Sequence, residues 1–258
     1  MYFIYSATVF FLYDSAKTKK YVIRPKQKNM QFGQKNFSRN FTDFERATWR
    51  AFEQVFPDVK LLGCAFHWTQ SLFRNLKKIG LVPHYHSNSR VKVLCKRAMS
   101  LHLLPSTKIR KVFLKLKKKA ANLKIGLLDK FFNYIDNNWM QPGIWSPEAW
   151  SVFFQIIRTN NDAEGWHNKL NKKGKGAGLH FYKLVQMLFL ESEFVEVEEA
   201  YLKQNQTTRH TRLDQKLMQA KLFRLWENYD ESREKNGSYK LLKRVAVLYT
   251  KKIVVVEG

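Results

Sequence analysis

Residues 41–81 read FTDFERATWRAFEQVFPDVKLLGCAFHWTQSLFRNLKKIGL, and this stretch decides the fold that the sequence predicts. Its first part has the pattern of an amphipathic helix that begins with a capping box, in which Thr42 caps the helix and Glu45 reaches back to it. Apolar side chains then recur with helical spacing and form one stripe: Phe44, Ala47, Ala51, Phe52 and Val55. Pro57 follows the end of this predicted helix.

The second part of the stretch predicts a strand that passes directly into another helix. Val59 to Leu62 is a short apolar run closed by Gly63, which is typical of a strand. A helix is predicted from Phe66 to Ile79, with Gly80 as its stop. The side chains expected to face inward from this helix are Phe66, Phe73, Leu76 and Ile79.

Outside this stretch, the sequence predicts strands near the N-terminus and mainly helices elsewhere. Tyr2 to Tyr13 is dense in aromatic and β-branched residues, which favours buried strands. Three later segments have helical patterns: residues 109–135, Leu179 to Glu199 and the run from Met218 to Tyr229. Residues 131–150 are expected to form an aromatic-rich turn region, and the tail segments VAVLY and IVVV are expected to be strands.

Charge is the unusual property of the composition. The chain of 258 residues contains 46 Lys and Arg against 21 Asp and Glu, a formal net charge of +25. An excess of this size favours a polyanionic partner, either nucleic acid or an acidic membrane surface. A hydrophobic content of 45% excludes wholesale disorder, and only two cysteines exclude a disulfide-rich scaffold. No segment has the length and apolarity of a transmembrane helix. The basic helix from Lys108 has the charge of a membrane-surface helix, but the segment TNNDAEGWHN has no membrane rationale, so we expect no membrane partner.

The positive charge is concentrated between residues 74 and 130, which contain 16 Lys or Arg and a single acid, Asp129. A solvated helix face is the ordinary explanation of a run of charges, but an imbalance of this size favours contact with phosphates. Such contacts position DNA without reading its bases. The side chains expected to contact double-stranded DNA are Lys108, Arg110, Lys111, Lys115, Lys117, Lys118 and Lys119.

Two acidic residues are candidates for binding a divalent cation. Asp43 is predicted to lie at a strand end and at the mouth of a helix, a position that suits a hard cation. The same position would also let it complement the helix dipole and do nothing else. Glu164 lies in the polar segment TNNDAEGWHN, with His167 and Asn168 one turn further along the same helix face. An N-cap cluster with an exposed glutamate would give the same pattern.

Cys64 and His67 form a C-x-x-H pair where the predicted strand passes into the second helix, a position at which α/β sheets gather functional groups. Two such residues are half of a zinc site, and His84, His86 or Cys95 could supply the rest. Their spacing matches no zinc finger. We therefore expect a buried cysteine and a hydrogen-bonded histidine that stabilise the junction, and we do not expect zinc.

Segments of the chain, taken in order, resemble the transposases of Mutator-like elements (MULE transposases). Residues 41–81 are similar to the part of that family in which an aspartate opens a D-F-E helix and a G-C-x-F-H-x-x-Q segment follows. The segment RTNNDAEGWHNKLN, residues 158–171, resembles the downstream T-N-N-x-x-E-G-W-H-N block. Between them, similar aromatic residues lie at Tyr134, Trp139 and Trp150. The resemblance extends over about residues 40–200.

The resemblance implies an α/β (α+β) fold: a partial ribonuclease-H-like core with a large helical insertion and a helical C-terminal region. It also implies a D-D-E triad that binds two magnesium (or manganese) ions for cleavage and transfer of DNA strands. Asp43 then matches the second acid and Glu164 the third, with Cys64 and His67 as the family's C-x-x-H pair. The implied parts are a core at 1–80, a basic helical insertion at 81–155, a third-acid segment and its helix at 156–205, and a helical extension at 206–258.

The chain departs from the family pattern before Asp43. The first acid should lie on a central strand well upstream, but the only acid there is Asp14, whose context FFLYDSAKTKK does not resemble that segment. We therefore expect a copy that is truncated at its N-terminus and catalytically incomplete. The alternative is a non-enzymatic basic DNA-binding remnant or a domesticated transposase-derived protein. The resemblance and the charge imply a nuclear location, and the oligomeric state stays open.

Overall fold

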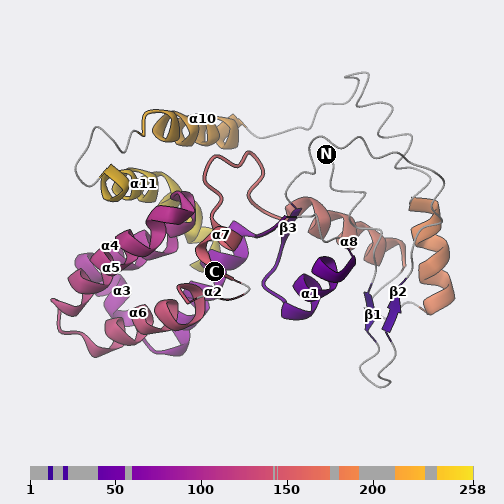
Figure 1. Cartoon of the computed structure of the whole chain (residues 1–258), viewed down its shortest axis with the longest axis horizontal. Coiled ribbons are helices and arrows are strands. Elements are labelled where there is room, and N and C mark those ends of the chain that lie inside the picture. Colours follow the sequence, from indigo (N-terminus) through magenta and orange to yellow (C-terminus); the bar gives the residue numbers. More distant parts are fainter. Residues whose placement is uncertain are drawn as a thin grey trace. The chain divides into compact units, whose positions relative to one another are not determined.

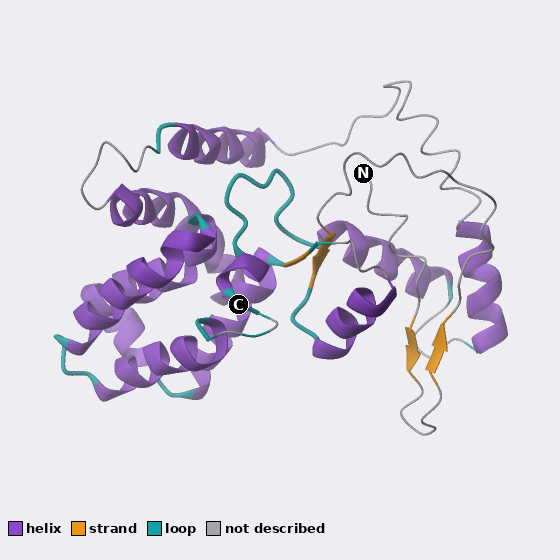
Figure 2. Cartoon of the chain, viewed as in Figure 1, coloured by secondary structure: helices purple, strands orange, loops and turns teal. Residues whose placement is uncertain are grey.

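The computed structural model describes residues 11–13, 20–22, 40–55, 60–141, 143, 145–174, 180–191, 213–229 and 237–257 (Figure 1). These residues are mostly helical, and the strands among them are three residues long (Figure 2), so the chain belongs to an α-rich or α+β class. Their contacts form two compact units. The first comprises Met1–Asn40, Arg50–Lys60 and Asn160–His210; the second comprises Phe41–Trp49, Leu61–Thr159 and Thr211–Gly258.

The second unit holds the basic helices. Strand β3 (Asn40–Thr42) and helix α1 (Arg46–Val55) belong to it in part, since each extends into the first unit. Its other elements are β4 (Leu61–Gly63), α2 (Ala65–Lys78), α3 (Val82–Ser87), α4 (Ser89–Met99), the 3₁₀ turn η2 (Leu101–Leu103), α5 (Ser106–Ala121), α6 (Gly126–Trp139), α7 (Pro147–Trp150), α10 (Leu213–Glu227) and α11 (Gly237–Glu257). Strands β3 and β4 pair with each other. Helix α5 packs against α4 and α6, and α11 packs against α2, α4, α5 and α10 (Figure 1).

The core of the second unit is built around Trp68 of α2. Its side chain is fully buried, and its ring stacks on Trp150 of α7 at a centroid distance of 4.1 Å. The edge of Trp139 from α6 meets the same ring at 5.0 Å. The indole N–H of Trp68 donates to the carbonyl of Met99 at the end of α4, at 3.0 Å. One side chain therefore joins four helices.

The strand and helix predicted in the second part of residues 41–81 are confirmed as β4 and α2. Gly80 ends the helix in the left-handed region, with φ at +76°, which favours glycine. The predicted inward face is partly wrong, because Phe66 and Ile79 are only half-buried. The face that packs in the core is formed by Ala65, Trp68, Thr69, Leu72, Phe73 and Leu76.

The capping box predicted at Thr42 is wrong. Thr42 ends β3, and its carbonyl accepts a hydrogen bond from the backbone N–H of Cys64 at 2.8 Å. Helix α1 begins later, at Arg46, and the carboxylate of Glu45 there accepts a hydrogen bond from the hydroxyl of Thr48 at 3.0 Å. The bond to Cys64 joins segments that are distant in sequence, so a local pattern cannot reveal that it holds Thr42 in a strand.

The aromatic turn region predicted over residues 131–150 is also wrong for most of its length. Helix α6 continues to Trp139, the described residues 140, 141, 143, 145 and 146 lie in the connection, and α7 begins at Pro147. Trp139 and Trp150 are buried parts of the core rather than turn residues. Burial of large rings stabilises helical positions here because each ring removes much apolar surface from water.

The helical pattern over residues 109–135 forms two helices rather than one. Helix α5 ends at Ala121, and Lys124 adopts a left-handed backbone with φ at +52° before α6 begins at Gly126. The break lets α6 pack beside α5. Both helices bury an apolar face, so the periodicity alone did not distinguish one helix from two.

The tail segments VAVLY and IVVV are helical, which corrects the prediction of strands. Both lie in α11, where Tyr239, Leu242 and Val245 recur at helical spacing and are buried. The preference of β-branched residues for strands is worth less than about 1 kcal/mol per residue, so burial of these side chains outweighs it. The helix predicted between Met218 and Tyr229 is confirmed as part of α10.

The first unit contains a short antiparallel pair of strands, β1 (Phe11–Tyr13) and β2 (Lys20–Val22), in which Phe11 is opposite Val22. The strand prediction for Tyr2 to Tyr13 is thus confirmed at β1, and residues 2–10 lie outside the described residues. The unit also contains α8 (Asn161–Lys173) and a helix at 181–191. That helix confirms part of the prediction for Leu179 to Glu199, whose residues 192–199 lie outside the described part.

Candidate functional site

Backbone hydrogen bonds join the start of α2 to the segments around Thr42 and Arg158. The N–H of Cys64 donates to the carbonyl of Thr42 at 2.8 Å, and the N–H of Ala65 donates to the carbonyl of Arg158 at 2.9 Å. The start of α2 is therefore bonded on one side to the strand that precedes Asp43. On the other side it is bonded to the first residue of the segment RTNNDAEGWHNKLN. Thr42, Cys64 and Arg158 are far apart in the sequence, and these bonds within the second unit bring their backbones together.

Asp43 lies between β3 and α1 in the second unit, with its side chain half-buried. Its carboxylate accepts a hydrogen bond from the hydroxyl of Thr42 at 3.5 Å, and its carbonyl accepts one from the indole of Trp49 at 2.7 Å. The first turn of α1 contains no acidic residue, because the helix begins only at Arg46. Asp43 is therefore at a strand end, as predicted, but it does not occupy the helix turn whose dipole it would complement.

Glu164 lies in the first turn of α8, where its backbone N–H donates to the carbonyl of Asn160 at 3.0 Å. Its side chain is half-buried, and His167 and Asn168 are exposed further along the helix. The predicted helix in this segment is confirmed. Glu164 belongs to the first unit and Asp43 to the second, so a shared metal site stays a prediction.

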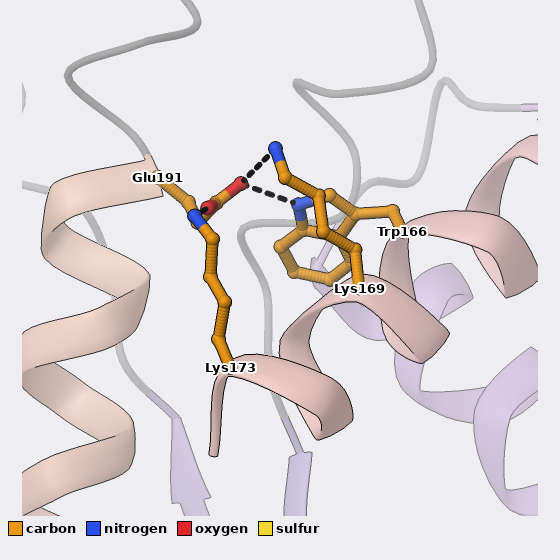
Figure 3. Close-up of polar contacts among 4 residues, drawn as sticks. All are labelled: Trp166, Lys169, Lys173 and Glu191. Carbon is orange, nitrogen blue, oxygen red and sulfur yellow. Dashed lines mark hydrogen bonds and ion pairs between the residues drawn. The ribbon is translucent and has the colours of Figure 1, made fainter. Parts of the chain in front are cut away.

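Glu191 holds the helix at 181–191 against α8 (Figure 3). Its carboxylate is 8% exposed and accepts hydrogen bonds from the indole of Trp166 at 3.2 Å, from Lys169 at 3.4 Å and from Lys173. Burial opposes its charged form, but the hydrogen bond from Lys173 and the charge of Lys169 outweigh burial and hold the pKa of Glu191 below its usual value. This acid anchors the helix that carries Glu164.

Cys64 and His67 occupy the junction between β4 and α2, as predicted, with Cys64 fully buried and His67 half-buried. The candidate partners do not complete a zinc site. His84 and His86 are exposed on α3, and burial raises the pKa of the Cys95 thiol to about 12, so this side chain is a neutral thiol. Within the described ranges, no three His, Cys, Asp or Glu side chains lie close enough to hold a metal ion.

His102 of η2 is a buried titratable group that the sequence did not single out. It is fully buried, and its Nδ1 lies 2.9 Å from the carbonyl of Met99, so this nitrogen donates to that oxygen. Burial lowers its pKa to about 3, the hydrogen bond to Met99 opposes the shift, and the positive charge of Arg158 adds to it. The imidazole is therefore neutral in the folded protein at any pH above this value.

Acid is expected to destabilise the second unit through His102. The unfolded chain binds a proton there below about pH 6.5, whereas the folded chain does not, so each pH unit between about 6.5 and 3 removes about 1.4 kcal/mol of stability. Urea unfolding at pH 7.5 and pH 4.5 measures this loss, which should be about 2 to 3 kcal/mol. The His102→Gln variant keeps a hydrogen-bond donor without a titrating ring, so its loss should be smaller. An equal loss in both proteins would exclude His102 as its source.

The seven basic residues predicted to contact DNA lie on α5, but they have different surroundings. Arg110 donates to the carbonyl of Met140 at 2.6 Å, and Lys117 forms an ion pair with Asp136 at 2.6 Å. Lys117 therefore connects α5 to α6, and Arg110 connects α5 to the C-terminal end of α6. Lys108 is half-buried, whereas Lys111 and Lys118 are exposed. The remaining two, Lys115 and Lys119, point toward α11.

Four cations gather around the ring of Tyr239 on α11, and we call this group the Tyr239 cluster. Measured to the ring centroid, Lys115 lies at 4.6 Å, Lys119 at 4.9 Å, Lys243 at 5.8 Å and Arg97 of α4 at 5.9 Å. Arg97 also donates to the hydroxyl of Tyr239 at 3.2 Å. The aromatic ring attracts each cation, but the like charges repel one another, so an anion at this place is stabilised.

Sequence reasoning did not identify Arg97, Tyr239 or Lys243 as binding residues. Strands are predicted only for VAVLY and IVVV, with no prediction for Tyr239 or Lys243, whose approach to Arg97 of α4 depends on how the helices pack. The signal that could have found them is the helical recurrence of cations at Lys240, Lys243 and Arg244, which spacings of three and four residues place on one face.

Comparison of the chain with protein-family models, with curated proteins and with solved structures gives no match. Over the ranges that the structure covers, none of the helices combines the length and the apolar character needed to cross a lipid bilayer. The contacts and charges of the described residues are therefore the basis for proposing a function.

Proposed function

We propose that this protein binds double-stranded DNA through the basic helices of its second unit and descends from a MULE-type transposase. The observation that carries the binding is the Tyr239 cluster, where α4, α5 and α11 place four cations within 6 Å of one ring centroid. Lys111 and Lys118 extend the positive surface along α5. Contacts of this kind recognise phosphates, so we expect little preference for base sequence.

The proposed descent is supported by the hydrogen bonds at the start of α2. Those bonds join the strand before Asp43, the C-x-x-H segment and Arg158, which are the parts of the chain that resemble the transposase family. The ribonuclease-H-like core belongs to the same proposal, with the paired strands β3 and β4 as part of its sheet. Burial of Trp139 and Trp150 gives the aromatic residues of the resemblance a structural role around α2.

The proposed metal chemistry is incomplete. A D-D-E site needs a cluster of carboxylates to hold two divalent ions. Asp43 has the hydroxyl of Thr42 beside its carboxylate, and within the described ranges no third His, Cys or acidic side chain completes a metal-binding group. The residues present do not fit a two-metal site on their own, so we derive no strand-transfer step. Magnesium bound by Asp43 and Glu164, and a nuclear location, stay parts of the proposal.

Binding and nicking of labelled duplex DNA, measured with magnesium or manganese, test the proposal directly. We expect salt-sensitive binding without nicking, and we expect the Asp43→Asn and Glu164→Gln variants to bind as the unmodified protein does. Absence of binding at low salt would contradict the proposed DNA partner. Magnesium-dependent nicking that both variants lose would contradict the incompleteness of the site, and would mean that another residue supplies the missing acid.

A further inference from the structure

A groove of about 920 Å³ lies between α10 and α11 in the second unit. Helices α10 and α11, which form the two sides of the groove, are bonded to other parts of the fold. Trp226 of α10 is buried and donates from its indole to the carbonyl of Leu103 at 3.0 Å. The hydroxyls of Tyr229 and Ser238 bond at 2.8 Å across the end of the groove. Helix α11 is held to the core by its buried Leu242 and Val245 and by its packing against α2, α4 and α5, so both walls of the groove belong to the packed fold.

Among the residues that the structure describes, the side chains that line the groove include five bases and no acid. They come from both helices: Lys221 and Arg224 from α10, and Lys240, Lys243 and Arg244 from α11. All five are exposed. Spacings of three and four residues place the bases of each helix on one face, about 5 to 6 Å apart. Two facing rows of like charge repel each other, and an anion between them would relieve that repulsion.

The lining also indicates which kind of anion fits. Its apolar part is aliphatic, from Leu225, Val247 and Leu248, and the described lining side chains include no aromatic ring on which an unpaired base could stack. Lys243 belongs both to the groove and to the Tyr239 cluster. The positive surface therefore continues from α4 and α5 into the groove. A regularly charged strand can follow such a path, with its phosphates on the bases and its sugars against the aliphatic side chains.

We propose that the groove between α10 and α11 binds the sugar–phosphate backbone of the duplex that the Tyr239 cluster holds. This inference rests on the proposed function and extends it, because it assigns the C-terminal helices a second contact with DNA. The groove lengthens the bound part of the duplex and adds phosphate contacts that the cluster alone does not make.

The test removes the charges that belong to the groove and leaves Lys243 in place. In the fourfold variant, Lys221, Arg224, Lys240 and Arg244 are each replaced by Gln. The matched control replaces four exposed bases elsewhere in the same unit by Gln: Arg74, Lys78, Lys124 and Lys130. Both proteins lose the same net charge, and thermal melting checks that both fold. Fluorescence anisotropy with a labelled duplex of about 30 base pairs then gives affinity as a function of salt.

The groove variant should bind at least about tenfold more weakly at 0.15 M salt, and its log–log salt slope should be smaller by about 3 to 4, since each phosphate contact contributes about 0.9. Its hydroxyl-radical footprint on the duplex should be shorter. The control should change the slope by no more than about 1. Equal losses in both variants would overturn the proposal in favour of a net-charge effect.

Two further outcomes distinguish the groove from the proposed function. If the unmodified protein binds DNA and the groove variant keeps its affinity, slope and footprint, the groove proposal is wrong and the proposed function stands. If the unmodified protein does not bind DNA, both fail. Vesicles that contain phosphatidylserine provide the remaining comparison. Loss of vesicle binding in the groove variant, with DNA binding unchanged, would assign the groove to an anionic lipid surface and overturn the proposal.

Discussion

Raising the salt concentration from about 50 to about 200 mM is expected to weaken the binding of this protein to duplex DNA about 10³-fold through the cations around α5 alone, and about 10⁵-fold when the groove between α10 and α11 also binds phosphates. The expectation follows from the cations available around α5. The Tyr239 cluster supplies Arg97, Lys115, Lys119 and Lys243, and α5 adds the exposed Lys111 and Lys118. About six phosphate contacts from these residues give a log–log slope near −5, since each contact releases counterions from the DNA, and the four further groove bases bring the slope of the unmodified protein to about −9. Anisotropy titrations at several salt concentrations measure this slope.

Variants of lysines on the same helix test whether the exposed side chains are the ones that contact phosphates. Replacing Lys111 and Lys118 by Gln should reduce the slope by about 2, because both side chains are exposed. The Lys117→Gln variant should leave the slope nearly unchanged, since Lys117 already pairs with Asp136 at 2.6 Å. A flat salt dependence of the unmodified protein would exclude phosphate contact as the source of affinity. An effect of Lys117→Gln as large as that of the other replacements would mean that net charge, not position, decides binding.

The Trp68→Ala variant is expected to lose about 3 to 5 kcal/mol of stability, a large part of the 5 to 15 kcal/mol typical of a folded domain. Trp68 is fully buried between Trp150 and Trp139, so its removal leaves a cavity where α2, α6 and α7 meet. The carbonyl of Met99 also loses the indole donor. Urea unfolding followed by far-ultraviolet circular dichroism measures the change in midpoint.

Two other substitutions provide reference values for the stability that Trp68→Ala loses. Trp68→Phe keeps an aromatic ring in the stack and should cost less than Trp68→Ala. Tyr182→Ala removes a ring that is 73% exposed and should change stability by no more than about 0.5 kcal/mol. A loss in Trp68→Ala no larger than that in Tyr182→Ala would show that the aromatic cluster does not hold the helices of the second unit together.

The junction between β4 and α2 could be predicted from the sequence because its signals are local. An apolar run closed by a glycine precedes helical periodicity that stops at Gly80, and each of these features acts over a few residues. Thr42 shows where such reasoning fails. Its spacing to Glu45 fits a capping box, yet its carbonyl bonds to Cys64, a residue with which no local pattern connects it.

The candidate binding surface was predictable in part for the same reason. The density of bases between residues 74 and 130 indicated a polyanionic partner, and all seven residues chosen on α5 have side chains that are exposed or half-buried. The sequence could not show that Arg110 and Lys117 are engaged with α6 and its end. Whether a lysine faces solvent or a neighbouring carboxylate depends on how the helices pack.

The charge of this protein, several of its helices and the junction at Cys64 follow from its sequence, because they depend on composition and on contacts within a few residues. The helical state of the apolar tail, the cations from α4 and α5 around Tyr239 and the basic groove between α10 and α11 depend on tertiary packing. The physical reason is that burial of Tyr239, Leu242 and Val245 against other helices outweighs the strand preference of the β-branched residues around them. That burial is a property of the packed chain and of no single segment.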